Sequence, residues 1–156
     1  MAKFIYRLQN VLDVKLKLEN QARTNFSLAA AKVNDEEERL SALYAKKTDY
    51  EDDYRKKSSG KLNVFELKQA RDNISYIDGR ITAQKKNVEM AKKSLEIARF
   101  QLNEAMKERK IHEKLKENAF EEFMHEENEA EKKEIDQLVS FRYNDKGKRV
   151  KTDGEE

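Results

Sequence analysis

The sequence contains no cysteine, no proline and no tryptophan, and it holds only four glycines. Without cysteine, the chain can form no disulfide, no thiolate zinc site and no cysteine nucleophile. Proline in a helix interior costs about 3 kcal/mol, so its absence favours long uninterrupted helices. No apolar run approaches the roughly 18 residues of a transmembrane helix, which predicts no direct membrane insertion. The early Lys3 interrupts the apolar stretch that a signal peptide needs, and we therefore expect a cytoplasmic protein.

Charge dominates what is present. Charged residues make up 41% of the 156 residues, whereas globular domains average about 25%. Apolar residues make up 37%, whereas globular domains average about 45–50%. This composition disfavours a compact core, but the retained leucine, isoleucine, valine and phenylalanine also disfavour disorder. The formal net charge of +2 is too small to predict a nucleic-acid partner. The composition therefore favours an all-α protein with extended helices.

Two apolar stripes with helical spacing predict two helices, over about residues 3–57 and 64–140. The second stripe is the more regular one, because seam positions recur at alternating spacings of three and four from Ile74 to Ala105. A sustained 3.5-residue period indicates a left-handed coiled coil. The seam residues of the second helix are Ile74, Ile77, Ile81, Gln84, Val88, Ala91, Leu95, Ala98, Leu102 and Ala105.

A single concentrated break, over residues 58–63, separates the two stripes. Its sequence is Ser-Ser-Gly-Lys-Leu-Asn, in which Gly60 is expected to end the first helix as a left-handed residue. Asn63 is expected to cap the second helix, with Glu66 at the capping-box position. So short a connection predicts an antiparallel hairpin, in which the numbers of facing residues add to about 122.

The charge pattern agrees with this register. Segment 34–53 carries eight acidic against three basic residues, and it should face Arg71, Arg80, Lys85 and Lys86. The second helix is the longer one, so that about 20 of its residues should overhang the first helix. This overhang should leave apolar side chains without a partner in the chain, a common sign of a binding site. They are Phe120, Phe123, Met124, Leu138 and Phe141. Residues 144–156 are expected to form a disordered tail.

The chain shows no pattern that predicts catalysis, a cofactor or a metal site. His112 and His125 lie about 140° apart around a helix, and the spacing of zinc-binding helices is absent. The four glycines are too scattered for a phosphate-binding loop. The acidic runs over 35–38 and 126–134 are expected to be solvated helix faces. Nucleic-acid binding is a weaker alternative, because acids offset the basic residues between 146 and 151.

Aromatic residues gather near the turn, where coiled-coil seams usually carry aliphatic ones. We expect Tyr50, Tyr54 and Phe65 to seal the end of the hairpin. Tyr76 lies between two seam residues and should point partly outward, as exposed binding anchors do.

Three segments resemble a known family. The opening Phe4-Ile-Tyr-Arg-Leu8, followed by Val11-Leu12, is similar to the start of the FliJ family of flagellar export proteins. Residues 109–117 resemble the family's Glu-Lys-Leu-Lys stretch, and residues 131–138 resemble its C-terminal region. The resemblance covers about residues 3–143, nearly the whole chain.

This resemblance implies a cytoplasmic stalk of the flagellar type III export apparatus, peripheral to the inner membrane. Its implied partners are the hexameric export ATPase, the cytoplasmic domain of the export gate and the export chaperones. The implied ring contact, at the open end of the hairpin, consists of Phe4, Leu8, Leu115, Phe120, Phe123 and Met124. The implied gate contact, which we term the tip patch, consists of Tyr50, Tyr54, Tyr76, Arg80 and Ala83. Arg80 and Asn87 differ from the Leu and His of some family members.

Three other interpretations remain open on sequence alone. The chain could be a generic coiled-coil scaffold or the corresponding stalk of a virulence-type secretion system. An RNA-binding helical hairpin is a third alternative, which predicts a steep dependence of RNA affinity on salt.

Overall fold

The computed structural model describes residues 2–152, and the side chains of residues 2–149. Two long helices account for most of this part of the chain: α1 spans Gln9–Ser59 and α2 spans Val64–Thr152. No strand occurs among the described residues. They divide into two compact units, which we term the terminal unit (residues 2–15 and 108–152) and the hairpin unit (residues 16–107). The predicted all-α hairpin fold is confirmed.

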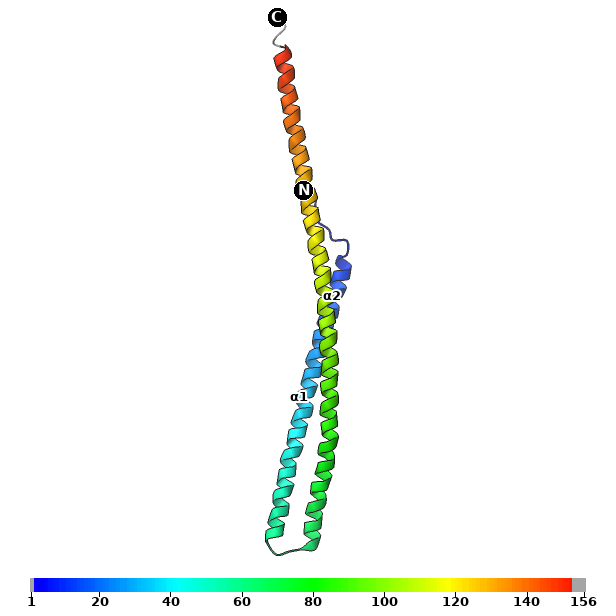
Figure 1. Ribbon diagram of the computed structural model, residues 1–156, viewed down its shortest axis with the longest axis vertical. Helices are drawn as coiled ribbons and strands as arrows, with labels where there is room; N and C mark the ends of the chain where they lie inside the picture. Colours follow the sequence, from blue (N-terminus) through cyan, green and yellow to red (C-terminus); the bar gives the residue numbers. More distant parts are fainter. Residues whose placement is uncertain (1, 153–156) are drawn as a thin grey trace. The chain divides into compact units, whose positions relative to one another are not determined.

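In the hairpin unit, α1 and α2 lie side by side and run in opposite directions from the turn (Figure 1). Their shared seam is apolar, and Ile77 at its centre is only 1% exposed. Burying a side chain of this size contributes about 1.5–3 kcal/mol. The predicted seam of α2 is therefore confirmed at its buried members, which are Ile77, Ile81, Gln84, Val88, Ala91 and Ala98.

The turn has the predicted cap but not the predicted glycine geometry. The Asn63 side chain accepts hydrogen bonds from the backbone N–H groups of Phe65 (3.1 Å) and Glu66 (3.5 Å) and so caps α2. Gly60 has no positive φ, and the predicted left-handed residue is therefore wrong. The hydroxyls of Ser58 and Ser59 instead donate to carbonyls of the last turn, at 2.7 and 3.1 Å. The Lys56 carbonyl, which accepts from Ser59, is one of the last four of α1, so this bond satisfies one acceptor that a left-handed cap would otherwise serve.

Ion pairs across the hairpin agree only in part with the expected register, and they use other bases than expected. Lys47 pairs with Asp78 at 2.8 Å, three residues from the predicted facing position, whereas Lys92 pairs with Glu37 at 3.5 Å, seven residues from it. The hydrogen bond and the charge of Asp78 raise the pKa of the Lys47 ammonium above its ordinary value. Such exposed pairs are worth little individually, so they select the alignment more than they stabilise it.

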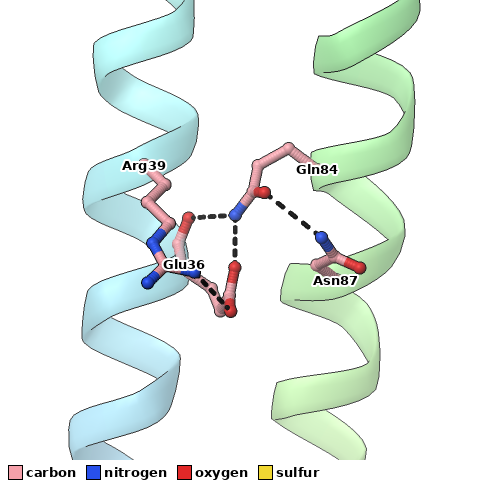
Figure 2. A network of polar contacts seen from close by, with 4 residues as sticks. All are labelled: Glu36, Arg39, Gln84 and Asn87. Carbon is pink, nitrogen blue, oxygen red and sulfur yellow. Dashed lines mark hydrogen bonds and ion pairs between the residues drawn. The ribbon is translucent and has the colours of Figure 1, made fainter.

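A buried polar layer interrupts the apolar seam (Figure 2). The Gln84 amide of α2 donates to the backbone carbonyl of Glu36 at 2.9 Å and to its carboxylate. Both residues are only 8% exposed. Arg39 lies 3.4 Å from the same carboxylate, and the Asn87 amide donates to Gln84 at 3.3 Å. A buried polar pair of this kind fixes the register of a coiled coil, because any slip would leave its groups unpaired.

The helix ends of the terminal unit differ from those expected. The first helix starts at Gln9 rather than near residue 3, because residues 2–8 leave the helical path and bring the Phe4 ring onto α2. In turn, α2 continues through Thr152, so that residues 144–152 are helical where a disordered tail was expected. Gly147 does not end the helix, since one glycine costs only about 1 kcal/mol. Residues 153–156 of the expected tail lie outside the described residues.

Candidate protein-interaction sites

An aromatic cluster anchors the N-terminal residues in the terminal unit. The Phe4 ring meets the Phe120 ring edge-to-face, with centroids 5.2 Å apart, and meets the Phe123 ring at 5.4 Å. Such pairs contribute about 0.5–1.5 kcal/mol beyond the area that they bury. The structure thus brings together three of the six residues that the resemblance implied for the open end. Phe120 and Phe123 were expected to have no partner in the chain, and this expectation is wrong because the non-helical N-terminal residues carry Phe4 onto them.

An open groove runs beside this cluster. Its walls come from the extended N-terminal residues and from one face of α2, and they are Lys3, Phe4, Ile5, Tyr6, Arg7, Leu8, Ala119, Glu122, Phe123 and Glu126. Leu8 therefore belongs to the same surface as Phe4 and Phe123. Leu115 and Met124 lie on α2 outside this lining, and both are partly exposed, as is Phe120. The groove combines an apolar floor with the carboxylates of Glu122 and Glu126.

Two buried polar atoms in this unit have no hydrogen-bond partner among the described residues. They are the hydroxyl oxygen of Tyr6 and Nδ1 of His112. Sequence reasoning treated His112 as a solvated or interfacial side chain and did not single out Tyr6. His112 lies seven residues after the seam residue Ala105, and both are half-buried, so its burial continues the spacing of the seam. Tyr6 lies in the non-helical residues 2–8, for which helical spacing gives no signal.

Beyond this groove, α2 has no covering chain. Every described side chain from residue 128 to 149 is exposed. Segment 113–134 carries nine acidic against four basic residues. Five large apolar residues follow closely, and they are Ile135, Leu138, Val139, Phe141 and Tyr143. Leu138 and Phe141 line a shallow hollow with Glu134. They are also the two of these five residues that the sequence predicted to lack a partner in the chain. The uncovered helix therefore presents acids and exposed apolar groups together.

The tip patch lies in the hairpin unit, on both helices. Tyr50 is half-buried and Tyr54 is partly exposed, and Tyr54 borders a shallow hollow with Ile74 of α2. Tyr76 is 64% exposed and points outward as predicted. Arg80 and Ala83 are also exposed on α2.

The aromatic residue next to the turn does not seal the hairpin. Phe65 is 76% exposed, which contradicts the expected sealing role. It follows Asn63 by two residues in the first turn of α2, before the α2 seam becomes buried at Ala70. The neighbouring side chains of Leu62 and Val64 are similarly exposed to solvent.

The described residues contain no group of three or more side chains that could hold a metal ion. Within the same part of the chain, no helix is both long and apolar enough to span a bilayer. The hollows found on it are shallow and open. The fold defines the class of the protein as a helical hairpin with exposed apolar side chains at several sites.

The comparisons with known proteins place this hairpin in a family. The model of the flagellar FliJ protein family matches residues 4–148, and the chain belongs to that family. It is therefore a coiled-coil protein associated with type III export. No curated protein matches the sequence. A solved structure described as a YscO homologue, CT670 from Chlamydia trachomatis, has a TM-score of 0.73 at 22% identity. The match covers 91% of this chain and 96% of CT670, and at this identity it supports the fold alone.

Proposed function

We propose that this protein is a stalk-like component of the flagellar type III export apparatus, which binds the hexameric export ATPase and promotes its assembly and activity. The proposal rests on one observation. In the terminal unit of this FliJ-family chain, the Phe4 cluster lies next to an exposed, acidic part of α2. We place the protein in the cytoplasm, at the inner-membrane side of the flagellar base, and assign it no catalytic role of its own.

The terminal unit has the properties that a shaft inside a protein ring needs. Leu8, Leu115 and Phe120 are partly exposed, so they can bury further apolar surface against a partner. The excess of acids over residues 113–134 calls for basic loops on that partner. A helix that is bare on all sides over residues 128–149 can be contacted by several subunits at once.

The tip patch supports a second contact, with the cytoplasmic domain of the export gate. Tyr76 offers a rigid, exposed aromatic anchor, and Tyr54 offers a second one on the other helix. Export chaperones are a further class of partner that the family resemblance implies, and we assign no residues to them.

The test of the ring contact is reconstitution with the cognate export ATPase. Leu138→Glu combined with Phe141→Glu should weaken binding and reduce the stimulation of turnover, because it removes exposed apolar groups without touching a buried one. Leu28→Glu is the matched control, since it makes the same change at an exposed position of the hairpin unit. Unchanged stimulation by the double variant and by a chain lacking residues 119–143 would refute the ring contact.

A virulence-type secretion stalk is the second candidate, which the fold of the YscO homologue favours. The same reconstitution separates the two candidates. Stimulation of a flagellar ATPase but not of a virulence-type ATPase supports the first proposal, and the reverse result supports the second.

For the gate contact, Tyr50→Ala with Tyr76→Ala should weaken binding of the gate domain with little loss of melting temperature. If the melting temperature falls and the loss of gate binding is explained by that destabilisation, these residues stabilise the fold rather than contact the gate.

A further inference from the structure

A second apolar stripe runs along α2, on the side that faces away from α1. Met90, Ile97 and Phe100, which we term the outer stripe, each follow a seam residue by two positions. Two residues correspond to about 200° around a helix, so the outer stripe lies opposite the seam. Its side chains are 66%, 60% and 66% exposed. The hairpin itself therefore gives these three large apolar residues no partner.

Basic residues flank this stripe. Lys86 and Lys93 lie on the same outer side of α2, and neither takes part in an ion pair within the described chain. Their neighbours Lys92 and Arg99, in contrast, pair with Glu37 and Glu96. From residue 86 to residue 100, four basic residues stand against two acidic ones. Met90 and Ile97 share one heptad position, and Lys86 and Lys93 share the neighbouring position with Phe100. The outer stripe is thus apolar with positive charge along one side, and Glu89 lies next to both lysines.

Small residues continue the same side of α2 toward the turn. Gly79 and Ala83 lie two positions after Ile77 and Ile81, and Ala83 also belongs to the tip patch. A Cβ added to Gly79 would meet nothing within 4 Å, so no contact within the described chain requires a glycine there. Glycine weakens a helix interior, and one common reason to keep it is the close approach of another backbone. Gly79 and Ala83 therefore leave room on this face of α2 for a second backbone.

We propose that the outer stripe docks an amphipathic helix of a partner protein that carries acidic residues beside its apolar face. Two helices pack side by side when each has a row of apolar residues at heptad spacing and the charged residues beside the two rows have opposite signs. The span from Lys86 to Phe100 would accommodate about four turns of the partner helix. The contact differs from the proposed ring contact in every residue, so either can fail without the other.

The test uses the full chain and two synthetic helical probes with the same leucine heptads, one flanked by glutamate and one by lysine. Fluorescence anisotropy at low ionic strength should show the acidic probe binding at least about tenfold more tightly than the basic one. Lys86→Glu with Lys93→Glu should reverse this preference. Ile97→Glu with Phe100→Glu should lower the affinity for the acidic probe by more than about tenfold. Leu28 is an equally exposed apolar residue on α1, so the Leu28→Glu variant should bind the acidic probe as tightly as the wild type does.

Several results would overturn the proposal. Equal affinity for both probes, or a loss in Leu28→Glu as large as that in the stripe variant, would show non-specific adsorption. A dimer in sedimentation velocity that Ile97→Glu with Phe100→Glu abolishes would assign the stripe to a second copy of this chain. Binding to phosphatidylserine vesicles, lost in the same variant, without binding to the acidic probe would assign it to a membrane surface. Circular dichroism of each variant should match the wild type, because the substituted side chains are exposed.

Discussion

Replacing Gln84 by leucine should destabilise the hairpin even though it makes the seam more apolar. Gln84 donates to both the backbone carbonyl and the carboxylate of Glu36, and both residues are nearly buried. Hydrogen bonds to charged groups contribute about 1.5–3 kcal/mol, and their loss leaves the Glu36 carboxylate with Arg39 alone. Burial of the leucine offsets part of this cost, which leaves a net loss of about 1–2 kcal/mol.

The double variant Glu36→Leu with Gln84→Leu should recover this stability, because replacing both members of a buried polar pair by apolar groups is often neutral or stabilising. Urea unfolding followed by circular dichroism measures both free energies. Each lost kcal/mol should lower the melting temperature by about 2–4 °C in a chain of this size. Asn87→Ala is the control, since Asn87 is exposed and donates to the Gln84 amide oxygen rather than to Glu36. A single variant as stable as the wild type, or a double variant no better than the single one, would refute the reasoning.

Three further predictions concern other parts of the fold. Phe4→Ala should increase hydrogen exchange over residues 9–15 while leaving the hairpin unit unchanged, because it removes both contacts with the phenylalanines of α2. Asn63→Ala should cost about 0.5–2 kcal/mol in urea unfolding through the loss of the N-cap, whereas Asn73→Ala, exposed within α2, should not. Because Asp78 raises the pKa of Lys47, their pair should stabilise the hairpin fully below pH 10.5 and lose this contribution as the pH rises through the raised pKa. Melting curves of the wild type and Asp78→Asn should therefore converge at the alkaline end, and a constant difference would contradict the assignment.

The hairpin could be predicted from the sequence because its main signals are local. The 3.5-residue period from Ile74 to Ala105 indicated the coiled coil, and the break at residues 58–63 indicated the antiparallel turn. Three details failed for physical reasons that a pattern does not carry. The Ser59 hydroxyl satisfies one of the terminal carbonyls that a left-handed Gly60 would serve, and Phe65 lies before the seam becomes buried. Beyond residue 143, the two glycines and the single apolar residue predict disorder, but the helix continues through Thr152.

The candidate sites were predictable to a smaller extent. The sequence singled out Phe4, Phe120 and Phe123, and the structure joins their rings. It listed Gln84 as a seam residue, but its pairing with Glu36 depends on a register that the charges indicate only approximately. The burial of the Tyr6 hydroxyl belongs to a non-helical segment, for which helical periodicity gives no signal, whereas the half-buried His112 continues the spacing of the seam. The outer stripe of Met90, Ile97 and Phe100 has the same period as the seam, but its exposure becomes evident only once α1 is in place.

The most direct test of the proposed function is the ATPase turnover of the purified cognate export ATPase, titrated with this protein. We expect stimulation together with hexamer formation, weakened by Leu138→Glu with Phe141→Glu and unchanged by Leu28→Glu. Failure of the wild-type chain to bind the ATPase or to change its turnover would contradict the proposal that the terminal unit is its docking site.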